Sequence, residues 1–185
     1  EMRKVAPTLM DATRIVWEQD TSRHIVCMVS PSVTEDVRAL AADQAFPIQL
    51  VTEDAEKADA YAAMTVAIAC SGTVTTELAA QGAAVVTGYK LGWITWGLLR
   101  AFLFKSKYSA LVNVAANAEV IPEFIQTRFT PSNLARAAGR LLDDENARQA
   151  QIAAQNTALD KMGRGATPAA EIAADAVLKV MAARA

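Results

Sequence analysis

Residues 65–90 constrain the fold more than any other stretch, because they read as strand, turn, helix and strand in succession. The apolar run before the turn is short and bounded, which is typical of a strand buried on both faces. The turn is the Ser-Gly-Thr triplet at 71–73, and the helical pattern over 74–81 ends at Gly82. A second apolar run at 84–87 completes the unit, and this order predicts parallel strands joined by a helix.

The turn at 71–73 has the features of an anion-binding site. A helix that begins after it leaves its first N–H groups without internal partners, and the helix dipole there favours negative charge. Gly72 lets a ligand approach the backbone closely, while Ser71 and Thr73 add hydroxyl donors. The carboxylate of Glu77 would repel a phosphate but can accept hydrogen bonds from two sugar hydroxyls. The alternative is structural: Ser71 or Thr73 caps the helix, and Glu77 is a solvated first-turn acid.

Composition narrows the class of protein. The 185 residues give room for one domain with a real core, and 52% of them are hydrophobic, as in globular proteins. The formal net charge of −2 argues against broad nucleic-acid binding, which usually needs a basic face. Cys27 and Cys70 both lie in apolar strand-like runs, so we interpret them as reduced core residues. No metal-ligand spacing is present, and the one histidine, His24, opens a strand.

The first half of the chain alternates helices with strands. The fold class that this predicts is α/β, with a Rossmann-like parallel sheet flanked by helices. Ligands bind such sheets beyond the carboxyl ends of the strands. The expected elements are an amphipathic helix over 1–19, a buried strand over 24–29, a helix over 33–44, a strand over 48–51 and a helix that ends near 62. The predicted binding rim comprises Ser30 and residues 51–53, 71–73 and 88–90.

Residues 91–104 interrupt this alternation with an apolar, aromatic helix that is too short to span a bilayer. Two interpretations stay open: an ordinary core helix, or a surface that meets a membrane, a lipid substrate or a second subunit. A short strand is expected over 108–114, where Asn113 is either a turn residue or a ligand contact. An extended stretch over 120–126 and helices over 131–143, 144–161 and 168–183 complete the chain.

Four pieces of the chain, taken together and in order, match a known family. They are Ser71-Gly72-Thr73 with Glu77, the run VVTGYK at 85–90, the run SALVN at 109–113 and the run VIPEFIQ at 120–126. On these pieces the chain resembles the C-terminal half of the lipid-A-disaccharide synthases, bacterial glycosyltransferases of the two-domain GT-B architecture. Two positions depart from the family pattern. Cys70 stands where alanine is usual, a conservative change, and Ala84 stands where proline is frequent, which loosens the turn before that strand.

The resemblance implies a sugar transfer that needs neither a metal nor a cofactor. Such an enzyme moves 2,3-diacylglucosamine from UDP-2,3-diacylglucosamine to 2,3-diacylglucosamine 1-phosphate and releases UDP, in the cytoplasm at the inner face of the inner membrane. In related enzymes the C-terminal half holds the nucleotide, so a single UDP-sugar-binding domain is expected over 1–185. By the same resemblance Ser71, Gly72 and Thr73 would meet the diphosphate, Glu77 the ribose, Glu53 and its turn the uracil, Asn113 the active-site region, and Tyr89 and Lys90 the edge of the cleft.

The general base and the Gly-Ser-Arg phosphate loop of this family precede the region that the chain matches. We therefore expect no catalytic residue in this chain and no sugar transfer by the chain alone. Because family members can exchange C-terminal segments, the helix at 168–183 is the expected crossing segment of a homodimer. No nucleic-acid partner is expected. The alternatives are another GT-B enzyme that binds a UDP-sugar, such as a peptidoglycan N-acetylglucosaminyltransferase or a UDP-sugar 2-epimerase, or a non-catalytic nucleotide-binding domain.

Overall fold

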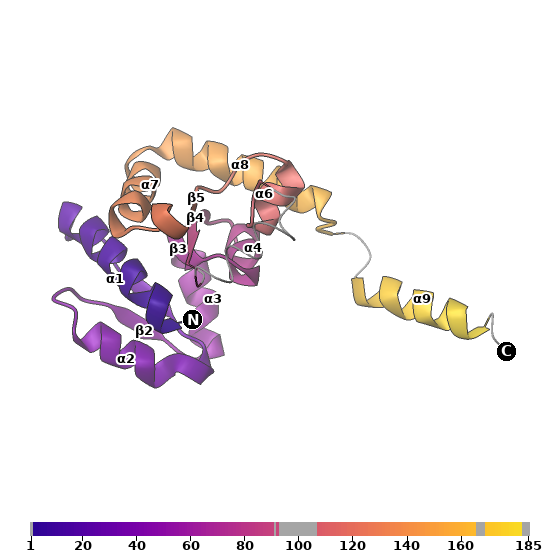
Figure 1. The fold of residues 1–185 in the computed structure, drawn as a ribbon, viewed down its shortest axis with the longest axis horizontal. Helices are drawn as coiled ribbons and strands as arrows, with labels where there is room; N and C mark the ends of the chain where they lie inside the picture. Colours follow the sequence, from indigo (N-terminus) through magenta and orange to yellow (C-terminus); the bar gives the residue numbers. More distant parts are fainter. Residues whose placement is uncertain (1, 91, 93–106, 166–168, 183–185) are drawn as a thin grey trace.

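The computed structural model describes residues 2–90, 92, 107–165 and 169–182, and it confirms an α/β fold of parallel strands flanked by helices (Figure 1). In chain order the elements are α1 (Met2–Gln19), β1 (Val26–Met28), η1 (Pro31–Val33), α2 (Thr34–Ala42), β2 (Gln49–Val51), α3 (Asp54–Ala63), β3 (Val66–Cys70), α4 (Thr73–Ala80), β4 (Ala84–Tyr89), α6 (Leu111–Ala116), β5 (Glu123–Ile125), η2 (Gln126–Arg128), α7 (Pro131–Asp143), α8 (Glu145–Lys161) and α9 (Ala169–Ala182). The aromatic helix predicted over 91–104 falls outside the described residues, apart from Gly92. Among the helices that are described, none is both long and apolar enough to cross a membrane.

The strands pair in parallel throughout, but they form two sheets. One sheet joins β1 to β2, and the other has the order β3-β4-β5. Residue 70, at the end of β3, is level with Gly88 of β4, so these two strands end together. The carboxyl ends of β3 and β4 therefore form one edge, which is where ligands bind in sheets of this kind.

Helices cover both faces of the three-stranded sheet. On one face α1 and α7 pack on alternate residues of β3 and β4, and on the other face α4, α6 and α8 do so (Figure 1). The alternation is clearest in β4, where Val86 lies in the cluster with α1 and α7 and Val85 in the cluster with α4, α6 and α8. β3, the strand predicted to be buried on both faces, alternates in the same way: Val66 and Ile68 pack half-buried against the first cluster, and Ala67 and Ala69 lie buried in the second.

Two glutamines of α8 complete the hydrogen bonding of β4. The short strand β5 pairs with β4 only from Thr87 onward, so among the described residues no strand lies beside the first half of β4 on that side. Gln155 donates from Nε2 to the Ala83 carbonyl (2.7 Å) and accepts at Oε1 from the Val85 N–H (3.3 Å). Gln151 donates to the Val85 carbonyl at 2.7 Å. Because a buried backbone group without a partner is costly, these side chains stand in for the absent strand.

The first predicted strand differs from expectation. It spans only Val26–Met28, and Val26 is 44% exposed, so the expectation of a buried strand is wrong there. The physical reason is that β1 has only β2 beside it in the described part of the chain. Both cysteines are half-buried, and burial raises the pKa of the Cys27 thiol, as suits a reduced, unreactive residue.

The prediction of a strand over 108–114 is wrong, since residues 111–114 belong to the helix α6 (Leu111–Ala116). Val112 and Asn113 are buried while Leu111 and Val114 are 48% and 43% exposed, which is a helical pattern rather than a strand pattern. The helix is only 6 residues long, so its own hydrogen bonds are too few to stabilise it. Hydrogen bonds with residues further along the chain stabilise it: the Glu123 carboxylate accepts from the Ala110 N–H, and the Asn113 amide donates to the Ile121 carbonyl.

Candidate functional site

The turn after β3 is open and has a backbone conformation that only glycine adopts readily. The N–H of Ser71 donates to the Gly88 carbonyl (3.1 Å), which fixes the start of the turn to the end of β4. Gly72 then takes φ +158° and ψ −161° as the N-cap of α4. No atom lies within 4 Å of the place where a Cβ would sit on Gly72, so the space around it is free. A ligand can therefore approach this part of the backbone closely.

The first residues of α4 are exposed. Gly72, Thr73 and Val74 are exposed, and in the described structure no side chain caps the helix. The structural alternative, in which Ser71 or Thr73 is the cap, is therefore wrong. The hydroxyl of Thr75 points inward instead and donates to the Gly72 carbonyl at 2.6 Å. Within the described residues, therefore, α4 begins without a side-chain cap and with the positive end of its dipole exposed, the arrangement that attracts anions.

Glu77 lies one turn along α4, on the wall of a pocket between α3 and α4. This pocket has a volume of about 460 Å³ and is lined by Asp54, Lys57, Ala58, Tyr61, Ala62, Glu77 and Gln81. The hydroxyl of Tyr61 donates to Glu77 Oε1 at 2.7 Å, and this hydrogen bond to the carboxylate raises the pKa of Tyr61 to about 12. Sequence reasoning did not single out Tyr61, because the two residues are 16 positions apart and no motif connects them.

Glu53 immediately precedes Asp54, the first α3 residue that lines this pocket, but it is not itself a lining residue. It directly follows β2 as the N-cap of α3, and its carbonyl accepts from the N–H groups of Glu56 and Lys57. Its side chain is exposed, while its neighbour Asp54 lines the pocket and holds Lys57 in an ion pair of 2.7 Å. The structure thus places Glu53 and Glu77 on the two helices that flank one pocket.

Tyr89 and Lys90 end the neighbouring strand. Tyr89 pairs with Ile125 of β5 and is half-buried, and Lys90 is exposed just beyond it. Since Cys70 and Gly88 are level, the Ser71 turn and Tyr89 leave the sheet at the same edge. The structure therefore brings these two predicted site residues together.

Asn113 is placed differently from the expectation of a ligand contact. Its side chain is fully buried, and its amide donates to the Ile121 carbonyl at 2.8 Å. Its Oδ1 accepts from the N–H groups of Val120 (2.9 Å) and Ile121 (2.8 Å). In this structure Asn113 joins α6 to the segment before β5 and has no open face towards a ligand, which corrects the sequence-based interpretation.

Glu123 and Ser109 form a buried link to the Ser71 turn that the sequence reasoning did not assign. The Glu123 carboxylate is 6% exposed and accepts from the Ala110 N–H (2.8 Å), the Ser109 N–H (3.2 Å) and the Ser109 hydroxyl. These donors, together with the start of α6, compensate the buried charge. The hydroxyls of Ser109 and Ser71 are 3.4 Å apart. The motif VIPEFIQ contained Glu123, but only the fold shows that it holds the start of α6 beside the turn.

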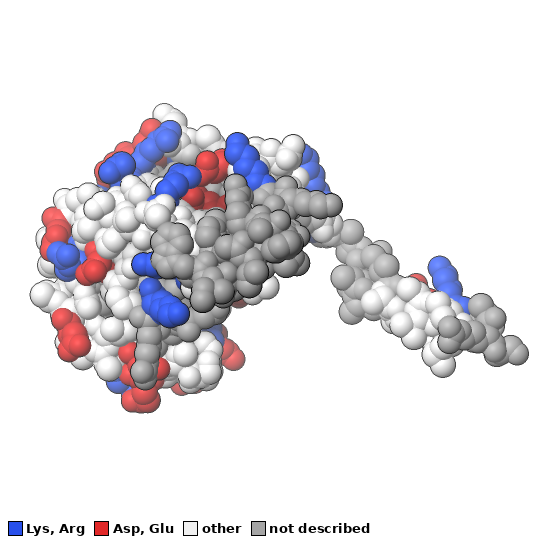
Figure 2. Space-filling view, in the orientation of Figure 1, with Lys and Arg blue, Asp and Glu red and all other residues white. Residues whose placement is uncertain are grey.

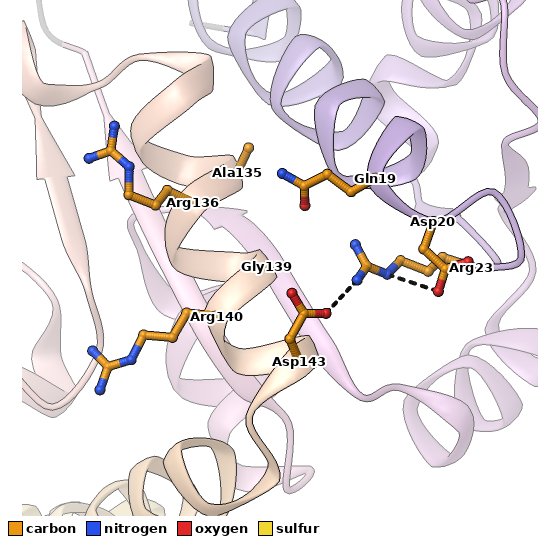
Figure 3. Close-up of a pocket in the computed structure, with 8 residues that line it drawn as sticks. All are labelled: Gln19, Asp20, Arg23, Ala135, Arg136, Gly139, Arg140 and Asp143. Atoms are coloured by element: carbon orange, nitrogen blue, oxygen red, sulfur yellow. Dashed lines mark hydrogen bonds and ion pairs between the residues drawn. The ribbon is translucent and has the colours of Figure 1, made fainter.

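A second pocket lies between α1 and α7 and does not have the features of an anion site. It measures about 540 Å³ and is lined by Gln19, Asp20, Arg23, Ala135, Arg136, Gly139, Arg140 and Asp143 (Figure 3). Arg23 is committed to Asp143 at 2.6 Å and to the Val16 carbonyl at 2.8 Å. Figure 3 shows Arg136 and Arg140 pointing away from Gln19 and Arg23. This pocket belongs to the contact between α1 and α7. The candidate site is therefore the Ser71 turn together with the α3–α4 pocket.

Comparisons with known proteins identify the family that the chain resembles. A family model described as lipid-A-disaccharide synthetase matches residues 1–177. A lipid-A-disaccharide synthase of Rhodospirillum centenum is 35% identical over 186 residues, which cover the whole of this chain and 46% of that protein. Those of Paramagnetospirillum magneticum and Ruegeria pomeroyi are 37% and 32% identical over 83% and 96% of this chain, and over 40% and 45% of their own lengths. The chain thus spans less than half the length of these relatives.

Proposed function

Because the chain belongs to the lipid-A-disaccharide synthase family, we propose that it supplies the site for the nucleotide of the sugar donor. The reaction proposed for the whole enzyme transfers 2,3-diacylglucosamine from its UDP donor to 2,3-diacylglucosamine 1-phosphate. The products are lipid A disaccharide 1-phosphate and UDP, in the biosynthesis of lipid A. One observation carries the proposal: the start of α4 is uncapped and open, at the carboxyl edge of a parallel sheet.

In this site the turn would bind the diphosphate and the pocket would bind the nucleoside. The N–H groups at the start of α4, which no side chain caps in the described structure, would bind the diphosphate, and the hydroxyls of Ser71 and Thr73 would add donors. Glu77, on the wall of the α3–α4 pocket, would accept hydrogen bonds from the ribose hydroxyls, and Glu53 at the start of α3 would lie near the uracil. Tyr89 and Lys90 would border the site at the end of β4.

The chemistry proposed for this half is stabilisation of the leaving group. As the glycosidic C–O bond breaks, UDP gains negative charge, and N–H groups already oriented at a helix start can stabilise it without a metal. The transfer would be inverting, with a general base outside this chain deprotonating the acceptor hydroxyl. We therefore expect no sugar transfer by the 185-residue chain alone, and turnover by the purified chain would contradict this.

We also propose that the enzyme works in the cytoplasm, peripherally at the inner face of the inner membrane. The support is chemical: the donor and the acceptor proposed above both carry acyl chains, so the enzyme has to meet them at a lipid surface. The apolar segment at 91–104 is the part of the sequence best suited to such a surface. Co-sedimentation with anionic lipid vesicles tests this proposal, and a chain that stays in the supernatant would contradict it.

Calorimetric titration with UDP tests the donor site, and Gly72→Ala is the variant that addresses its geometry. The unsubstituted chain is expected to bind UDP. Alanine at position 72 is disfavoured at the observed φ of +158°, so the turn would change its conformation and the dissociation constant would rise about tenfold.

Gly165→Ala is the matched control for this variant. Gly165 also has positive φ (+77°) and open space around it, but it follows α8, away from the turn. Its replacement should strain the backbone similarly while leaving the affinity for UDP unchanged. Absence of UDP binding by the unsubstituted chain, or equal affinities of the two variants, would contradict the proposed site.

The last helix is proposed as the crossing segment of a homodimer. Figure 1 shows α9 extending away from the rest of the chain. Four of its apolar side chains are 56–63% exposed, namely Val177, Leu178, Val180 and Met181. Apolar side chains this exposed are stabilised by packing against a partner surface, here α9 or the body of a second copy.

Leu178→Asp is expected to convert a dimer into a monomer, because a charge would be buried in that contact. The measurement is the mass in solution by light scattering. Leu111→Asp is the control, since Leu111 is also an exposed leucine, at 48%, but lies in α6. A monomeric unsubstituted chain, or a dimer that survives Leu178→Asp, would contradict the proposal.

A further inference from the structure

We infer that Tyr61 is a positioning residue, which holds the Glu77 carboxylate in the orientation that receives the ribose hydroxyls of the donor nucleotide. This inference rests on the proposed function, because it takes Glu77 as the ribose contact. It adds a residue from α3 to a site whose other members come from the ends of β2, β3 and β4 and from α4.

The geometry is that of a side chain held from one side only. Glu77 is exposed on α4, and Tyr61 is half-buried on α3, with its hydroxyl 2.7 Å from Glu77 Oε1. In the described structure no other hydrogen bond or ion pair fixes this carboxylate. The nearby Lys57 is held by Asp54 at 2.7 Å, so its ammonium group is committed elsewhere. The hydrogen bond from Tyr61 thus restricts the Glu77 side chain to one of the orientations that it could adopt.

A fixed carboxylate binds a diol better than a free one. An exposed glutamate samples many rotamers, and a ligand that uses one of them has to offset the lost side-chain entropy. Tyr61 already restricts Glu77 through one hydrogen bond to Oε1, and among the described residues no hydrogen-bond donor to Oε2 is found. The hydroxyl of Tyr61 stays protonated throughout the physiological range, since its pKa is raised to about 12 by the carboxylate. The donor that holds Glu77 is therefore always present.

A purely structural role would be different in its consequences. If the hydrogen bond between Tyr61 and Glu77 served only to join α3 to α4, its loss would lower the affinity of every ligand of the pocket equally. If it positions Glu77, its loss affects only ligands that carry ribose hydroxyls. The two cases are separated by comparing UDP with 2′,3′-dideoxyuridine 5′-diphosphate, which lacks both hydroxyls and keeps the uracil and the diphosphate.

The experiment measures the affinity of the chain for both ligands in Tyr61→Phe, Glu77→Gln and the double variant. For UDP, Glu77→Gln is expected to raise the dissociation constant about tenfold, and Tyr61→Phe about threefold to fivefold. The double variant should bind UDP like Glu77→Gln alone, because Tyr61 acts only through Glu77. For the dideoxy ligand all three variants should match the unsubstituted chain.

Each outcome separates the inference from the function it rests on. Unchanged UDP affinity in Glu77→Gln would overturn the proposed ribose contact, and the inference with it. If Glu77→Gln lowered the affinity for UDP and Tyr61→Phe did not, the inference would be overturned and the proposed function would stand. If Tyr61→Phe lowered the affinities for UDP and for the dideoxy ligand equally, the role of Tyr61 would be structural only, and the inference would again be overturned. A spectrophotometric titration adds a readout without ligand: Glu77→Gln should lower the pKa of the Tyr61 phenol from about 12 towards its ordinary value, and an unchanged titration curve would overturn the inference.

Discussion

Replacing Gln155 with leucine is expected to lower the free energy of unfolding by about 3–5 kcal/mol. Gln155 is fully buried, and its amide bonds the Ala83 carbonyl, the Val85 N–H and the Gln151 side chain. Leucine has nearly the same size but no polar atoms, so two backbone groups of the central strand would lose their partners in the interior. Urea denaturation measures the effect, with the slope of the transition unchanged if the fold is kept.

Gln149→Leu is the matched control for that experiment. Gln149 is the same residue type in the same helix, α8, but it is exposed. Its replacement should change the free energy of unfolding by less than about 0.5 kcal/mol. If the two variants were equally stable, the assignment of the α8 glutamines as substitutes for a strand beside β4 would be wrong.

Replacing Glu123 with alanine is expected to lower the free energy of unfolding by about 3 kcal/mol. The N–H groups of Ser109 and Ala110 and the hydroxyl of Ser109 would all lose their acceptor at the buried start of α6. Because Ser109 lies beside Ser71, the affinity for UDP should fall as well. Thermal or urea denaturation and UDP titration measure the two effects.

Glu56→Ala serves as the control for the loss of a carboxylate. Glu56 lies in the first turn of α3 and is exposed. Its replacement should change the free energy of unfolding by less than about 0.5 kcal/mol, since exposed acids contribute little to stability. Glu123→Gln should be less harmful than Glu123→Ala, because the amide oxygen can still accept one or two of the hydrogen bonds. A Glu123→Ala variant as stable as Glu56→Ala would contradict the role given to this carboxylate.

Local patterns predicted the unit that carries the candidate site. The apolar run, the Ser-Gly-Thr turn, the helix and the next apolar run lie within 26 consecutive residues, and the structure has β3, α4 and β4 there. Strand and helix periods and a glycine stop are properties of neighbouring residues, so they can be read without the fold. The N-cap of α7 is equally local, since the Thr130 hydroxyl accepts from the N–H of Asn133, three residues along the chain.

The sequence by itself thus determined the α/β class, the position of the turn at the end of a buried strand and, through its ordered motifs, the family. Only the tertiary structure decided that residues 111–116 are a helix, that Asn113 is buried and that Tyr61 holds Glu77. It also decided that Gln155 replaces a strand. Each of these depends on a hydrogen bond between residues 7 to 72 positions apart. Sequence periodicity does not reveal such pairs, because they depend on the distance between elements after the core has packed.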